Sequence, residues 1–67
     1  MITPMRIKRV MREMTQMDVS LRADLPQWKV SLFERGVCPR SDEALRIAEV
    51  LGADVKDLFP ALQEARQ

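Results

Sequence analysis

The side chains that could do chemistry in this 67-residue chain favour binding over catalysis. There is no histidine and a single cysteine, Cys38. A Ser-His-Asp or Cys-His nucleophilic site is therefore excluded, and a typical zinc site has too few ligands. No acid–base pair or cofactor motif stands out either. We expect a protein that is not an enzyme and that uses no cofactor or metal.

The charged side chains are distributed unevenly along the chain. Residues 1–40 hold eight basic and four acidic side chains, a net charge of +4, and residues 41–67 hold three basic and six acidic ones, a net charge of −3. The formal net charge of +1 therefore averages a basic part with an acidic part. A basic region of this kind is typical of a nucleic-acid contact, because Lys and Arg bind phosphates.

Length and composition predict a single domain over residues 1–67. The apolar fraction of 46% makes disorder unfavourable. Cys38 has no partner for an internal disulfide, which favours a reducing compartment. No apolar run approaches the roughly 20 residues of a membrane span, and no signal-peptide pattern opens the chain. We expect a cytoplasmic protein without membrane contact.

The apolar spacing predicts an all-α fold of five short helices and no sheet. Pro4 suits the first turn of the first helix, on which Ile7, Val10, Met11 and Met14 share one face. The further helices are expected from Gln16 to about Ala23, near Pro26 to about Glu34, about Ser41 to Leu51, and Asp54 to Phe59. The expected inner stripe of the fourth helix is Ala44, Leu45, Ile47, Ala48 and Leu51. Residues 60–67 are expected to be one more helical turn, a dimerisation segment or a disordered tail.

The block from Thr15 to Gly36 is the most informative segment of the chain. Thr15 followed by Asp18 is a capping-box pattern, which predicts a helix starting at Gln16. Asp24 tolerates a left-handed turn. The block therefore predicts two short helices joined by a tight turn, and such a pair presents its second helix as an edge that fits the DNA major groove.

This block resembles the Cro/CI-type (XRE) helix-turn-helix family, and the resemblance extends over roughly residues 5–59. The matching residues within the block are Thr15, Gln16, Val19, Ser20, Leu25, Val30, Ser31, Phe33, Glu34, Arg35 and Gly36. The sequence departs from the pattern at Asp24, where the family often has Gly, and at Pro26, where a Ser or Thr usually caps the second helix. The resemblance implies a compact five-helix lambda-repressor-like DNA-binding domain whose helix-turn-helix spans about residues 15–36.

The resemblance also implies which side chains touch DNA. The expected base-contacting residues are Gln27, Trp28, Lys29, Ser31 and Leu32. The expected phosphate-contacting residues are Gln16, Arg22, Arg35 and Arg40. The Gln27 amide can form hydrogen bonds to adenine N6 and N7 at the same time. Trp28 has a competing interpretation as a partly buried core residue or a protein contact.

Two structural roles follow from the same resemblance. Glu34 is expected to pair with an arginine of the first helix, either Arg9 or Arg12 depending on how the turn before Thr15 is aligned. The expected dimer surface is formed by Leu58, Phe59, Ala61 and Leu62.

The function expected from these features is sequence-specific binding of double-stranded DNA by a transcriptional regulator. The resemblance favours a repressor that binds a palindromic operator as a homodimer. One alternative is a DNA-binding antitoxin that pairs with a toxin. A second is a protein-interaction module that has lost DNA binding, which an exposed patch of Leu21, Trp28 and Leu32 would favour.

Overall fold

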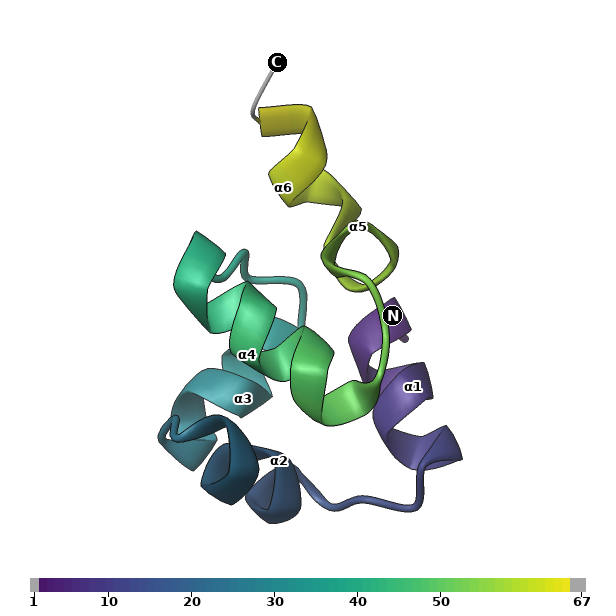
Figure 1. The fold of residues 1–67 in the computed structure, drawn as a ribbon, viewed down its shortest axis with the longest axis vertical. Coiled ribbons are helices and arrows are strands. Elements are labelled where there is room, and N and C mark those ends of the chain that lie inside the picture. Colours follow the sequence, from purple (N-terminus) through teal and green to yellow (C-terminus); the bar gives the residue numbers. More distant parts are fainter. Residues whose placement is uncertain (1, 66–67) are drawn as a thin grey trace.

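The computed structural model describes residues 2–65 of the chain, with side chains up to residue 62, and these residues form an all-helical fold without strands. The helices are α1 (Pro4–Met11), α2 (Gln16–Ala23), α3 (Gln27–Glu34), α4 (Ser41–Leu51), α5 (Val55–Leu58) and α6 (Pro60–Ala65). Figure 1 shows α2, α3 and α4 stacked together, α1 and α5 beside them, and α6 leading away towards the C-terminus. The all-α prediction is confirmed.

The expected five helices become six in the described residues. Pro60 ends α5 and begins α6, because its fixed φ suits a first helical turn and its missing N–H is not needed there. Residues 60–65 of the expected tail are therefore helical, and residues 66–67 lie outside the described residues. No helix in the part of the chain that the structure describes is long and apolar enough to cross a membrane.

Local signals place both ends of α2. The Asp18 N–H donates to Thr15 Oγ1 at 3.0 Å, and the Thr15 N–H donates to Asp18 Oδ2 at 2.9 Å, so the predicted capping box forms. The Thr15 N–H, together with the Thr15 hydroxyl, holds the pKa of the Asp18 carboxyl below its usual value. At the other end Asp24 is left-handed, with φ 56° and ψ 48°, and its N–H reaches the Ser20 carbonyl. The turn predicted at Asp24 is thus confirmed.

The core is built mainly from the inner faces of α2, α3 and α4. Its buried apolar residues are Met5, Val19, Ala23, Leu25, Val30, Phe33, Ala44, Ile47, Ala48, Leu51, Leu58 and Phe59. Val19 and Ala23 on α2 and Val30 and Phe33 on α3 face inward. Leu45 is the exception on α4, because it is 60% exposed although its neighbours are buried.

The apolar face of α1 points to solvent, contrary to the usual placing of such a face. Ile7, Val10 and Met11 are 48%, 58% and 71% exposed. The inward face instead carries Met5, which is fully buried, and Arg9, whose guanidinium pairs with buried Glu34. Residues four apart share a helix face, so turning Met5 and Arg9 inward turns the apolar stripe outward.

Candidate nucleic-acid interface

The helix pair α2 and α3 is joined by the short connection at residues 24–26 and packs against α4. Pro26 precedes α3 without a side-chain cap, and the helix begins one residue later at Gln27. Val30, Phe33 and Glu34 form its buried face. Helical spacing directs residues 28, 31 and 32 outward, and exposed Gln27 lies beside them, one helical turn before Ser31.

The outer face of α3 carries four of the five predicted base-contacting side chains. Gln27 is exposed, and Ser31 and Leu32 are half-buried. Trp28 is 61% exposed, so it does not belong to the core. The structure therefore brings these four side chains to one accessible strip at the start and middle of α3.

Lys29 differs from these residues because it is bound to α4. Its Nζ lies 2.6 Å from Glu43 Oε2, and the Arg40 N–H donates to Glu43 Oε1 at 3.0 Å. The Lys29 bond, reinforced by the Arg40 N–H, lowers the pKa of the Glu43 carboxyl. The Lys29 ammonium also lies 5.7 Å from the centre of the Trp28 ring, within cation–π range. Lys29 thus joins α3 to α4 rather than projecting freely with the strip.

Glu34, the last residue of α3, joins three helices by accepting hydrogen bonds from α1 and α2. Its carboxylate accepts from the Arg9 Nε, from Arg9 Nη2 at 3.2 Å, and from Gln16 Nε2 at 3.0 Å. Arg9 Nη1 also donates to the Met14 carbonyl at 2.7 Å. Arg9 is therefore the arginine that pairs with Glu34. Gln16, expected at a phosphate, is half-buried with its amide on Glu34.

The three arginines expected at phosphates have exposed side chains. Arg22 and Arg35 are exposed, and Arg35 Nε bonds its own helix at the Ser31 carbonyl over 3.4 Å. Arg40 makes an exposed pair with Asp42 at 3.6 Å. Pairs of this kind contribute little energy, so these side chains can turn towards a phosphate.

Arg46 is a basic residue near this surface that sequence reasoning missed. It lies on α4, and its Nη1 donates to the carbonyl of Asp24, in the turn between α2 and α3, at 3.3 Å. Its Nη2 lies 3.3 Å from Asp42. The sequence placed Arg46 in the acidic part of the chain, and only the packing of α4 against α2 brings it to the turn.

Comparison with known proteins leaves the family undecided. No family model, curated protein or solved structure matches this chain. The resemblance to the helix-turn-helix family therefore stays a prediction. Within the described residues there is also no group of three His, Cys, Asp or Glu side chains that could hold a metal ion.

Two of the four residues expected at a dimer surface are unsuited to that role. Leu58 and Phe59 are buried in the core, because α5 closes over α1 and α4. Ala61 is exposed, and Leu62 packs partly against the core. Leu58 and Phe59 therefore have little area left for a second chain, and the expected dimer surface stays a prediction.

Proposed function

We propose that this chain is a sequence-specific double-stranded DNA-binding regulator of the Cro/CI-type helix-turn-helix family, with α2 and α3 as the helix-turn-helix. The observation that carries the proposal is the outer strip of α3. Gln27, Trp28, Ser31 and Leu32 share one accessible face, while the opposite face is anchored through Val30, Phe33 and Glu34. An exposed helix face on a rigid support is what readout in the major groove requires.

The side chains of the strip suit base edges. Gln27 bonds adenine through its amide, which offers one donor and one acceptor. Trp28 and Leu32 suit thymine methyl groups or sugars. Arg22, Arg35 and Arg40 supply phosphate contacts, and Arg46 adds a fourth cation near the turn. Lys29 supports α3 through Glu43 and is left out of this set.

A repressor of this type acts by occupying its operator and excluding other proteins. One recognition helix reads only a few base pairs, so useful specificity requires two copies. A two-fold dimer places its recognition helices one helical turn of DNA apart, about 34 Å, and its operator is a palindrome. The modest net charge of +1 keeps nonspecific binding weak.

A protein-binding role is the second candidate, and exposed apolar side chains favour it. Leu21 on α2 and Trp28 on α3 are both largely exposed. In an antitoxin such a surface would hold the toxin while the chain represses its own operon. In an interaction module it would hold a partner without DNA. Selection of bound sites from random DNA identifies the interaction module, because that module alone enriches no motif. Copurification with a toxin identifies the antitoxin.

The decisive experiment is quantitative DNA binding by matched variants on a selected site. Gln27→Ala should weaken specific binding by about 1–3 kcal/mol and relax the preference at one base pair. Arg35→Ala should weaken binding to all sequences and reduce the salt slope by about 1. Lys56→Ala removes an exposed positive charge on α5, away from the strip, and should change neither. Absence of binding at low salt would refute the proposal.

A further inference from the structure

The solvent-facing side of α1 is apolar at its centre and basic at both edges. Ile7, Val10 and Met11 form the exposed stripe described above. At 100° per residue, Arg6 lies on one side of this stripe and Lys8 on the other. The described contacts give neither side-chain charge a partner within the chain. An apolar face of this kind marks an interaction surface.

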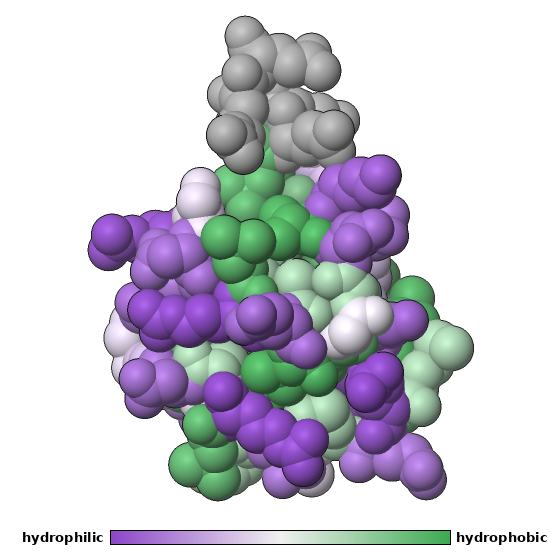
Figure 2. Space-filling view, in the orientation of Figure 1, coloured by the Kyte–Doolittle hydropathy of each residue, from purple (hydrophilic) through white to green (hydrophobic). Residues whose placement is uncertain are grey.

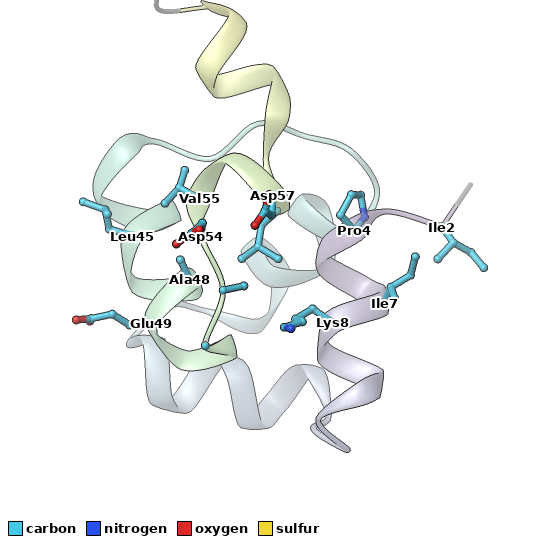
Figure 3. Close-up of a pocket in the computed structure, with 13 residues that line it drawn as sticks. Ile2, Pro4, Ile7, Lys8, Leu45, Ala48, Glu49, Asp54, Val55 and Asp57 are labelled. Atoms are coloured by element: carbon cyan, nitrogen blue, oxygen red, sulfur yellow. The ribbon is translucent and has the colours of Figure 1, made fainter.

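A groove of about 780 Å³ opens beside this face, between α1 and the α4–α5 corner. Ile2 and Ile7 line one wall, and Leu45 and Val55 line the other, as Figure 3 shows. The buried side chains of Ala48 and Leu58 lie between the two walls. In Figure 2 apolar surface runs through the middle of the molecule between polar residues. The groove has the apolar lining that receives an amphipathic helix.

The charges around the groove have the opposite sign to those of α1. Glu49, Asp54 and Asp57 line it and are exposed, and Lys8 is the single cation that lines it among the described residues. The groove is therefore acidic and apolar, and the helix that fits it is basic and apolar. The outer face of α1, with Arg6 and Lys8 beside its stripe, has that composition.

We propose that the occupant of the groove is α1 of a second copy of this chain. A two-fold axis makes the contact reciprocal, because each copy offers one basic helix face and one acidic groove. A typical specific interface buries about 800 Å² per partner, roughly a sixth of the 4627 Å² surface of this chain. A pair of such contacts also covers exposed Leu45 and the α1 stripe. This interface rests on the proposed function, because it specifies how the homodimer forms. Dimerisation is measured without DNA, so a failed dimer test and a failed DNA-binding test can be told apart.

Charge reversal tests the pairing directly. One variant carries Arg6→Glu on the helix face, and the other carries Glu49→Lys and Asp57→Lys on the groove. Lys8 is left unchanged, because it lines the groove as well as the stripe. In sedimentation equilibrium each variant alone should dimerise at least about tenfold more weakly than wild type, because like charges then face each other. Mixed in equal amounts they should form a heterodimer with nearly wild-type affinity, because both contacts again join opposite charges.

A matched pair of apolar variants completes the test. Leu45→Asp, in the groove, should weaken the dimer at least about tenfold. Leu21→Asp is the control, because Leu21 is similarly exposed, at 73%, but lies outside the groove. Circular dichroism checks that all variants are folded. The proposal is overturned if the wild-type chain stays monomeric at concentrations up to about 0.5 mM. Binding of a basic amphipathic peptide to that monomer would not rescue it, because the occupant would then be another protein. The proposal is equally overturned if mixing restores no heterodimer or if the control weakens the dimer equally.

Discussion

Replacing Glu43 by glutamine separates two roles of Lys29, base reading and support of α3. The structure joins Lys29 Nζ to Glu43 Oε2 at 2.6 Å and the Arg40 N–H to Glu43 Oε1 at 3.0 Å. Glutamine keeps an acceptor for the Arg40 N–H and removes the negative charge. We therefore predict that Glu43→Gln and Lys29→Met both destabilise the fold, and that their effects are coupled.

The size of the effect follows from the burial of the pair. The Glu43 side chain is 7% exposed and that of Lys29 is 32% exposed. Hydrogen bonds to charged groups contribute about 1.5–3 kcal/mol, and partial exposure of Lys29 places this pair at the low end, about 1.5 kcal/mol. For a domain of this size that loss lowers Tm by roughly 6–12 °C. The coupling energy in a double-mutant cycle should be about 1 kcal/mol.

The pH dependence has a definite sign. The folded-state pKa of Glu43 is lowered from 4.5, mainly by Lys29, so its stabilising contribution is fully present above that value. The contribution is lost as pH falls through the lowered folded-state pKa. The stability difference between wild type and Glu43→Gln should therefore be constant near neutral pH and shrink below about pH 4.5.

The assay is thermal and urea unfolding of wild type, both single variants and the double variant, followed by circular dichroism. Gel shifts with Lys29→Met at a temperature where it is fully folded provide the second readout. The reasoning predicts reduced stability with an unchanged base preference. A coupling energy below about 0.3 kcal/mol would refute the energetic argument. A changed base preference with unchanged stability would show that Lys29 reads DNA.

Four further variants test the helix contacts, with Arg12→Met as the control for Arg9→Met. Arg9→Met should lower the free energy of unfolding in urea by about 3 kcal/mol, because it leaves buried Glu34 without its cation. Arg12→Met should lower it by less than about 0.5 kcal/mol. Equal losses would contradict the assigned pair. Thr15→Ala should cost about 1 kcal/mol by removing the oxygen that caps α2, and an unchanged midpoint would show that the cap contributes nothing. Gly52→Ala should cost about 1 kcal/mol, because residue 52 has φ +63° and the new methyl would lie 3.0 Å from the Arg12 guanidinium; a raised Tm would contradict this.

Local sequence signals predicted most of the secondary structure. The capping box at Thr15 and the left-handed Asp24 act within a few residues, and α2 begins and ends where they indicate. Gly52 ends α4 in the same way. Such signals depend on backbone geometry and on hydrogen bonds between near neighbours, so they are readable without the fold. The segment from residue 60 onwards was left open by the sequence, and there Pro60 both ends α5 and begins α6.

The faces of the helices were predicted less well, because periodicity identifies an apolar stripe but not what covers it. The stripes of α2 and α3 meet other helices and are buried. The stripe of α1 is not, because Arg9 must reach Glu34 and Met5 fills the core. Leu45 on α4 is also exposed. It lines the groove between α1 and the α4–α5 corner, where no other helix covers it among the described residues.

By itself the sequence determined where α2 and α4 begin and end, that a site needing histidine is excluded, and which block resembles a DNA-reading motif. Only the tertiary structure decided that Lys29 is held by Glu43, that Arg46 reaches the turn at Asp24, and that Leu58 and Phe59 belong to the core. These contacts join residues from 14 to 22 positions apart or depend on how α5 packs. Their partners are chosen by the packing of whole helices, which no local pattern of residues specifies.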